Sequence, residues 1–328
     1  MGGYKTTNGL MRHLRDSGIN IEGSGQKRQL RNIGYYHGYK GYRFFQTANN
    51  RIPFSSWEEV YATVQYDTKL KTLFYGKMMF IETAVKNVAL ECILSATGSE
   101  NIQVMYDKVI SGYNNAPAGL DNRARKELQK KKLHLQSTIQ SNLERAYARG
   151  NPKITHFYNN LNYESVPLWS LFEIMMMGDF GSLLECLDLQ TRDEITKALG
   201  MNLAADTNRE LIYKYLYTFK DLRNAIAHND VVFDARFRRI DPTRAMKDCL
   251  QRDIGLPFVN FKSIGDYVIL TCYYLKNLGV TKTEIKGFIR EFEKITDEYK
   301  TLVNPAVAAI VIRGDLQQRM TILKNYVG

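Results

Sequence analysis

The feature that most limits the fold of this chain is the repeated occurrence of helix-start signals followed by apolar residues at helical spacing. Apolar residues recur at three- and four-residue steps over residues 70–88 and again over 211–226. Alternating strand patterns and tight hairpin dipeptides are largely missing. Capping boxes, in which a hydroxyl residue precedes a glutamate by three positions, occur at Ser56 with Glu59, Thr191 with Glu194, Thr207 with Glu210 and Thr281 with Glu284. The sequence therefore predicts an all-α fold.

The charge and the cysteines restrict the class of partner and the compartment. The net charge of +11 favours a polyanionic partner, either a nucleic acid or an anionic membrane, and a merely basic surface is the alternative. The cysteines have no Cys-x-x-Cys pair and no histidine at zinc-ligand spacing, which argues for a reducing compartment and against a zinc site or a disulfide scaffold. They are Cys92, Cys186, Cys249 and Cys272.

The ends of the chain carry no membrane signal. The N-terminus lacks the apolar core of a signal peptide, and the longest apolar run near the C-terminus is too short to span a bilayer. We therefore expect a cytoplasmic protein with no membrane partner. We expect neither a metal nor another cofactor.

Changes in composition divide the chain into four parts. Residues 1–51 are a basic, tyrosine-rich helical head, and residues 52–116 are a helical core segment. Residues 117–152 form a basic helical arm. Residues 153–328 hold the remaining helices, which we expect to form one compact unit.

The head combines positive charge with aromatic rings. It holds nine lysines and arginines against two acidic residues, and its segment 33–45, IGYYHGYKGYRFF, interleaves tyrosines with cations. This composition suits RNA, because bases stack on rings while cations meet phosphates. The alternative is that the tyrosines pack a short helical hairpin with glycine turns. The expected RNA contacts are Arg28, Arg31, Tyr35, Tyr36, Lys40 and Arg43.

The arm is polar and lysine-rich, with proline and glycine near both ends. It is either a solvated helical hairpin or an arm that faces nucleic acid, and a run of charge is more often a solvated face. Further candidate RNA contacts are Lys130, Lys131 and Lys132 in the arm, and Arg236 and Arg238 farther along the chain.

The strongest chemical signal is LRNAIAHND, residues 222–230, which places Arg223 and His228 near the end of an amphipathic helix. Histidine titrates closest to physiological pH, and arginine keeps its charge and suits phosphate. Such a pair offers a group that transfers protons and a group that binds phosphate, the minimum needed to cleave RNA without a metal. Two further matches to the Arg-x(4–6)-His pattern are interrupted by glycine or proline: Arg31 with His37, and Arg149 with His156.

Helix geometry sharpens this hypothesis. At 100° per residue, Asp221, Asn224 and His228 share one polar stripe, away from the apolar positions that point to the core. The amide of Asn224, one turn before His228, can reach the imidazole. Arg223 lies roughly 140° from His228 around the helix. We therefore expect a symmetric second copy to bring arginines and histidines to one phosphate.

Four ordered segments carry a family resemblance. They are IGYYHGYKGYRFF with its glycine-tyrosine pattern, VYATVQYDTKLKTLFYGKMMFIETAVKNVAL with a tyrosine-aspartate helix, VPLWSLFEIMMMGDFGSLLECL with a proline-aromatic-glutamate pattern and a downstream glycine, and FKDLRNAIAHND with an R-N-x-x-x-H signature. In these segments the chain resembles the Abi-like abortive-infection proteins of the AbiD/AbiF type, which belong to the HEPN superfamily of ribonucleases.

The resemblance implies a multi-helix HEPN-like bundle with N-terminal and C-terminal helical additions. It implies that Arg223 and His228 are the catalytic pair and that Asn224 is the polar residue that follows the arginine. It suggests a structural hydrogen bond for Glu173. It also implies a homodimer, a target RNA, a small noncoding RNA that restrains or binds the protein, and a toxin role in phage defence or a toxin–antitoxin system.

The expected reaction is metal-independent endonucleolytic cleavage of RNA by attack of the 2′-hydroxyl, which leaves a 2′,3′-cyclic phosphate and a 5′-hydroxyl. His228 would take or give a proton, Arg223 would stabilise the developing charge, and Asn224 would orient the imidazole or bind the phosphate. The alternative is a non-catalytic RNA-binding or dimerisation protein in phage defence. Nucleotide transfer is disfavoured, because the sequence shows no Gly-rich phosphate loop and no paired carboxylate site.

Overall fold

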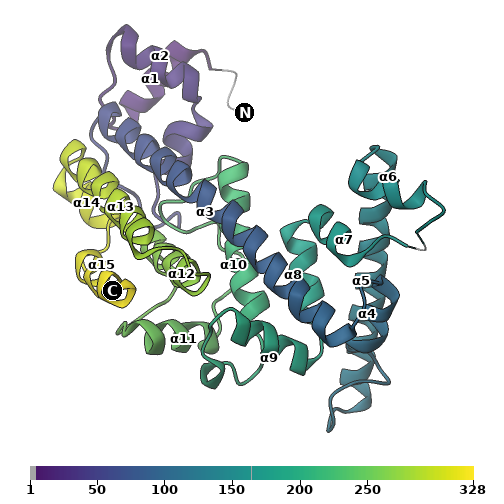
Figure 1. Ribbon diagram of the computed structural model, residues 1–328. Helices are drawn as coiled ribbons and strands as arrows, with labels where there is room; N and C mark the ends of the chain where they lie inside the picture. The colour runs from purple at the N-terminus through teal and green to yellow at the C-terminus, as the bar shows by residue number, and fades with distance from the viewer. Residues whose placement is uncertain (1–4, 164) are drawn as a thin grey trace. The chain divides into compact units, whose positions relative to one another are not determined.

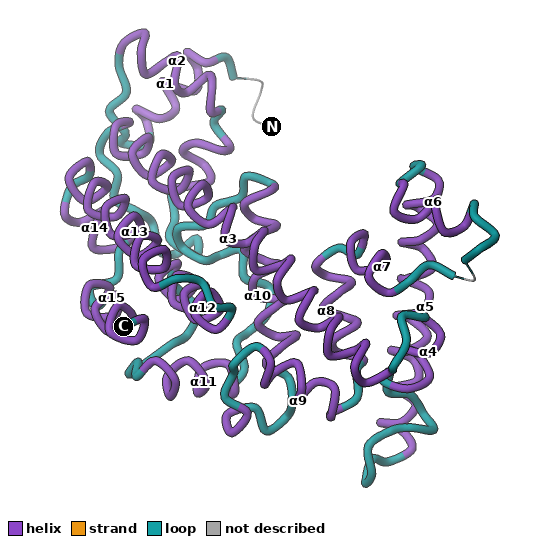
Figure 2. Tube along the Cα trace, in the orientation of Figure 1, coloured by secondary structure: helices purple, strands orange, loops and turns teal. Residues whose placement is uncertain are grey.

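The computed structural model describes residues 5–163 and 165–328, and these residues form helices joined by loops, with isolated β-bridges as the only extended pairing (Figures 1 and 2). The predicted all-α fold is confirmed. The helices are α1 (Thr7–Asp16), α2 (Gly23–Ile33), the π-helical turn η1 (Tyr36–Lys40), α3 (Trp57–Thr97), α4 (Ile102–Lys108), α5 (Asn122–Ala148), α6 (Pro152–Tyr158), α7 (Leu168–Ile174), α8 (Met177–Cys186), α9 (Leu189–Ala198), the 3₁₀ turn η2 (Leu203–Ala205), α10 (Leu211–Ala227), α11 (Arg244–Ile254), α12 (Ile264–Asn277), α13 (Lys282–Leu302), α14 (Pro305–Val311) and α15 (Leu316–Val327).

The described residues group into two compact units, each assembled from separate stretches of the chain. As far as the chain is described, the first unit comprises Met1–Met78, Asp221–Arg239 and Ile254–Gly328. The second comprises Met79–Lys220 and Ile240–Asp253. The long helix α3 and the helix α10 each contribute residues to both units.

The core of the first unit forms around α12, which is buried along almost its whole length and contacts α13 and α15. Aromatic pairs join the first part of α3 to α13. Tyr66 stacks on Tyr299 with ring centroids 4.5 Å apart, and Phe74 meets Phe288 edge-on at 5.6 Å. All four rings are buried, and burial of each such side chain stabilises the fold by roughly 1.5–3 kcal/mol.

In the second unit, α5 packs against α6, α7 and α8. The arm predicted as a possible hairpin is one continuous helix, because Asp121 caps its start and nothing interrupts it before Gly150. Leu135, Ile139 and Leu143 recur every four residues on its buried face. This apolar stripe holds the helix against its neighbours while most of its charged residues stay exposed.

In two of the four predicted capping boxes the hydroxyl residue caps a helix N-terminus, and at α3 the glutamate also accepts the N–H of that residue. Ser56 and Glu59 cap the start of α3 reciprocally, and Thr281 accepts a hydrogen bond from the backbone of Glu284 at the start of α13. The prediction for Thr191 is wrong, because Asp188 caps α9 and accepts the N–H of Thr191.

The prediction for Thr207 is wrong for a similar reason. The carboxylate of Asp206 accepts the backbone N–H groups of Glu210 at 2.7 Å and Leu211 at 3.2 Å, where α10 begins. An aspartate one position earlier in the chain therefore takes the capping role that the sequence pattern assigned to the threonine.

None of the described helices combines the length and the apolar character needed to cross a lipid bilayer.

Candidate functional site

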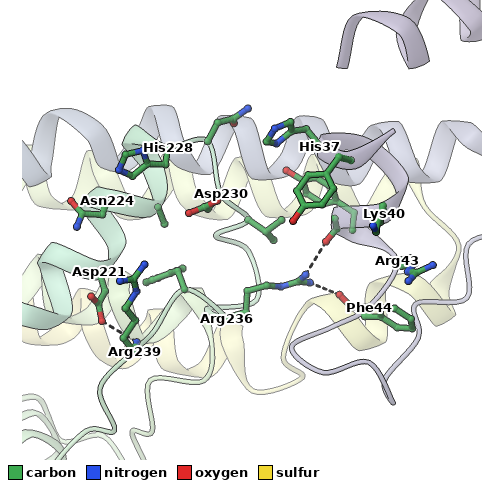
Figure 3. Close-up of a pocket in the computed structure, with 17 residues that line it drawn as sticks. His37, Lys40, Arg43, Phe44, Asp221, Asn224, His228, Asp230, Arg236 and Arg239 are labelled. Atoms are coloured by element: carbon green, nitrogen blue, oxygen red, sulfur yellow. Dashed lines mark hydrogen bonds between the residues drawn. The ribbon is translucent and has the colours of Figure 1, made fainter. Parts of the chain in front are cut away.

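The first unit contains a pocket of about 640 Å³ between the glycine-tyrosine segment and the end of α10 (Figure 3). One wall comes from residues 36–44, and the other comes from residues 221–239. The two segments that the sequence singled out for RNA binding and for catalysis therefore meet in one hollow. The lining residues with polar or charged side chains are Tyr36, His37, Lys40, Tyr42, Arg43, Asp221, Asn224, His228, Asn229, Asp230, Arg236 and Arg239.

The position of His228 is set by the way α10 ends. Asn229 adopts a left-handed conformation with φ of 56°, and its N–H donates to the carbonyl of Ile226 at 3.2 Å. The N–H of Asp230 donates to the carbonyl of Ala225 at 2.8 Å, which completes a Schellman motif. Lys71 also donates to the side chain of Asn229 at 2.8 Å. His228 is therefore held exposed at the helix C-terminus, where the chain turns away.

The polar stripe predicted on α10 faces this pocket. Asp221, Asn224 and His228 all line it. Asp221 is buried, and its carboxylate accepts the backbone N–H of Arg239 at 3.0 Å, as Figure 3 shows. This contact ties the loop after α10 back onto the helix, while Asn224 and His228 present their side chains at the opening.

Arg223 is half-buried and is not among the described residues that line the pocket. Its Nη1 donates to the Oδ1 of Asn224 at 3.2 Å. Within one chain, therefore, Arg223 contacts Asn224 but does not line the pocket, whereas His228 lines it. The helical repeat predicted this divergence of the two side chains.

Some tyrosines of segment 33–45 pack in the interior and one is exposed, where it could stack on an RNA base. Tyr39 and Tyr42 are buried, as the packing alternative predicts. Tyr35 is half-buried and its hydroxyl lies 3.1 Å from Nε2 of His13. Tyr36 is 66% exposed and lines the pocket, and the ammonium of Lys40 lies 5.4 Å from the centre of its ring. One tyrosine thus offers an open ring face beside a cation.

Of the candidate arginines near the pocket, Arg43 lies over the ring of Phe44 at 4.7 Å and lines the hollow. Arg236 also lines it, but its guanidinium binds the buried Asp234 and the carbonyls of Gly41 and Phe44. The guanidinium of Arg236 therefore joins the two walls of the pocket.

The remaining candidate RNA contacts lie outside the pocket. Arg238 is one of them, and it donates to the carbonyl of Asn260 at 3.1 Å. Arg28 and Arg31 are exposed on α2. On α5, in the second unit, Lys131 pairs with Glu185 at 2.7 Å.

Two further lysines of α5 also have partners within the unit. Lys132 donates to the carbonyl of Tyr106 at 2.7 Å, and Lys130 lies 3.9 Å from Glu127. The resemblance suggested a structural hydrogen bond for Glu173, and this residue accepts one from Lys153 at the surface.

A buried carboxylate, Asp67 on α3, holds both walls of the pocket. It accepts the hydroxyl of Tyr42 and the N–H groups of Val232 and Phe233, each at 2.8 Å. Lys71 forms an ion pair with it, also at 2.8 Å. Burial raises the pKa of the Asp67 carboxyl above its usual value, and the charge of Lys71 opposes that effect.

Sequence reasoning missed five polar residues of the pocket, which are His37, Tyr42, Asn229, Asp230 and Arg239. His37 belongs to an Arg-x(4–6)-His match that Gly34 interrupts. The signal that could have found it is its place inside the glycine-tyrosine segment. The described residues contain no group of three or more histidine, cysteine or acidic side chains placed to hold a metal ion.

Comparison with known proteins identifies the family. The sequence model of the family described as Abi-like protein matches residues 28–234, which include the first wall of the pocket and the part of the second wall up to residue 234. No curated protein and no solved structure gives a significant match. Because the match spans more than half of the chain, this protein belongs to the Abi-like protein family.

Proposed function

We propose that this protein is a metal-independent endoribonuclease that acts in abortive infection or a related toxin–antitoxin system. The observation that carries the proposal is the pocket itself. It places Asn224 and His228 opposite Tyr36, Lys40 and Arg43. An acid–base group, phosphate-binding cations and an exposed ring for base stacking are the components that cleavage of single-stranded RNA needs. The Abi-like family supports the defence role.

In the proposed reaction, RNA supplies its own nucleophile. The 2′-hydroxyl attacks the adjacent phosphorus, and His228 moves a proton at one of the two oxygens involved. The cations of the pocket stabilise the negative charge that builds on the phosphate oxygens. Asn224 orients the imidazole of His228 or binds the phosphate.

The divergence of Arg223 and His228 within one chain supports a homodimer as the active form. Arg223 reaches Asn224 but does not line its own pocket. A second copy related by a two-fold axis brings a guanidinium to the phosphate, as the R-N-x-x-x-H resemblance to HEPN ribonucleases of the AbiD/AbiF type suggests.

A cognate small noncoding RNA is the proposed restraint on the activity. The exposed cations of α2, Arg28 and Arg31, lie outside the pocket and are available to a longer RNA. A bound RNA that covers the pocket would block target RNA by competition. Such binding is electrostatic and therefore weakens steeply as salt is raised.

The test is cleavage of single-stranded RNA by the purified protein in a chelating buffer. We expect His228→Ala to reduce the rate by about 100- to 10,000-fold, the usual contribution of an acid–base residue. His134→Ala is the matched control, because His134 is an exposed histidine on α5. Replacing the ribose at the cleavage site by deoxyribose should stop the reaction.

Two results would contradict the proposal. Cleavage of the deoxyribose substrate would show that the nucleophile is not the 2′-hydroxyl. Salt-dependent RNA binding with no turnover, unchanged by His228→Ala, would favour a non-catalytic RNA-binding protein instead.

A further inference from the structure

The pocket holds a second imidazole, on the wall opposite α10. His37 belongs to the π-helical turn η1, and it is exposed and lines the same hollow as His228. Figure 3 shows both rings, that of His228 at the end of α10 and that of His37 on the other segment that forms the pocket. Both histidines belong to the first compact unit of one chain. No second copy is therefore needed to bring the two imidazoles to one hollow.

The turn that carries His37 is closely packed at its two glycines. Gly38 has a non-helical backbone, and a Cβ there would lie 3.1 Å from the side chain of Ile33. A Cβ at Gly41 would lie 2.9 Å from the carbonyl oxygen of Tyr36, so only glycine fits. The ring of Tyr36 also meets the edge of the His37 ring, with centroids 5.5 Å apart. The imidazole is thus presented from a turn that is packed closely at Gly38 and Gly41 and contacts the ring of Tyr36.

We propose that His37 is the second acid–base residue of the cleavage reaction and acts with His228 of the same chain. This inference rests on the proposed ribonuclease function. Cleavage by the 2′-hydroxyl needs two proton transfers, and arginine cannot perform either because it does not deprotonate in proteins. Two imidazoles of one pocket supply both.

The bond from the 2′-oxygen to phosphorus forms while the bond from phosphorus to the 5′-oxygen breaks. One imidazole, initially neutral, takes the proton of the 2′-hydroxyl, and the other, initially protonated, gives a proton to the departing 5′-oxygen. The products are a 2′,3′-cyclic phosphate and a 5′-hydroxyl, and exchange with water resets the two rings.

The experiment uses two RNA substrates that differ at one linkage. One carries the normal 5′-oxygen, and the other carries a bridging 5′-sulfur, whose thiolate leaves without a proton. On the oxygen substrate, His37→Ala and His228→Ala should each slow cleavage by about 100- to 10,000-fold. On the sulfur substrate, one of the two variants should recover to near the wild-type rate and the other should not.

A control and a second readout keep this test decisive. His13→Ala changes a histidine of the same unit that does not line the pocket, and it should cleave both substrates normally. His37→Gln keeps a polar side chain without an imidazole, and it should be as slow as His37→Ala. Because the two imidazoles act within one chain, mixing His37→Ala protein with His228→Ala protein should not restore activity.

The outcomes separate the two proposals. Normal cleavage of the oxygen substrate by His37→Ala would overturn the role of His37 and leave the ribonuclease function standing. The role of His37 would also be overturned if His37→Ala is slow on the oxygen substrate and the sulfur substrate rescues neither His37→Ala nor His228→Ala. Equal rescue of both variants would overturn it as well. If the wild-type protein cleaves neither substrate, the ribonuclease proposal fails and the role of His37 fails with it.

Discussion

The phenol of Tyr42 donates a hydrogen bond of 2.8 Å to the buried carboxylate of Asp67. The same carboxylate accepts the backbone N–H groups of Val232 and Phe233 at the same distance. Tyr42 belongs to the glycine-tyrosine wall, and residues 232 and 233 belong to the loop after α10. One aspartate on α3 therefore ties the two walls of the pocket together.

We expect Asp67→Ala to lower the free energy of unfolding by about 3–5 kcal/mol, because it leaves Lys71 largely buried without its carboxylate and removes the acceptor of two backbone N–H groups. Tyr42→Phe removes a single hydrogen bond and should cost about 1 kcal/mol. Urea unfolding followed by fluorescence of the buried Trp57, in a Trp169→Phe background, measures both. Equal costs for the two variants would contradict the anchoring role of Asp67.

The acid sensitivity of the first unit should depend on Glu59. Burial raises the pKa of this carboxyl, but hydrogen bonds from Ser55 and Asn304 outweigh burial and hold its pKa below the usual 4.5. A carboxyl whose pKa is lower in the folded state than in the unfolded state stabilises the fold at pH values above its unfolded-state pKa. That stability is lost as the pH falls through its folded-state pKa. Glu59→Gln should therefore cost about 1.5–3 kcal/mol at pH 7, and the difference from wild type should shrink below pH 4.5.

The matched control for this experiment is Glu58→Gln, which changes the exposed neighbour on the same turn and should cost less than about 0.5 kcal/mol. Unfolding curves at pH 7 and at an acidic pH give the comparison. If the difference in free energy of unfolding between Glu59→Gln and wild type stays constant or grows as the pH is lowered, the ionised carboxylate of Glu59 is not the source of this stability.

Local periodicity predicted much of this structure, because helices form from neighbours in the sequence. The spacing of Leu222 and Ile226 identified α10, and the same repeat placed Asn224 and His228 together at the pocket. The composition of segment 33–45 identified the opposite wall. The contact between these walls could not be predicted, since Asp67 lies 165 residues before Val232 and no periodic signal links them.

Other features depend on which of several neighbouring residues takes a given hydrogen bond or ion pair, and a sequence pattern does not show which one does. Thr207 fits a capping box, but Asp206 beside it is the stronger acceptor and takes the role. Arg236 fits a basic patch, but Asp234 two residues earlier binds its guanidinium. His37 lies in a segment interrupted by glycine, and those glycines build the turn that presents it.

Arg236 should act as a clamp between the walls more than as a contact for phosphate. Its planar fork reaches Asp234 and the carbonyls of Gly41 and Phe44 together, which a lysine ammonium cannot do. Arg236→Lys keeps the charge but should increase amide hydrogen exchange in residues 41–46, by loosening their attachment. Arg239→Lys, at an exposed position of the same pocket, is the control and should leave that exchange unchanged. Weakened RNA binding by Arg236→Lys with normal exchange would support the phosphate role instead.

Close packing in the second unit should make Gly181 intolerant of any side chain. A Cβ at this buried position of α8 would lie 2.5 Å from the ring of Tyr217 on α10. The ring cannot move away cheaply, because its hydroxyl contacts Ser182 at 3.3 Å and Glu185 at 3.4 Å. We expect Gly181→Ala to lower the free energy of unfolding by about 1–3 kcal/mol, measured by urea unfolding.

The control for Gly181 lies three residues earlier on the same helix. A Cβ at Gly178 would meet only the side chain of Lys220 at 3.5 Å, an ordinary contact, so Gly178→Ala should be neutral or slightly stabilising. Adding Tyr217→Leu to Gly181→Ala replaces the ring by a smaller, flexible side chain and should recover part of the loss, beyond the sum of the two single changes. If the two single substitutions simply add, the destabilisation of Gly181→Ala does not come from the ring of Tyr217.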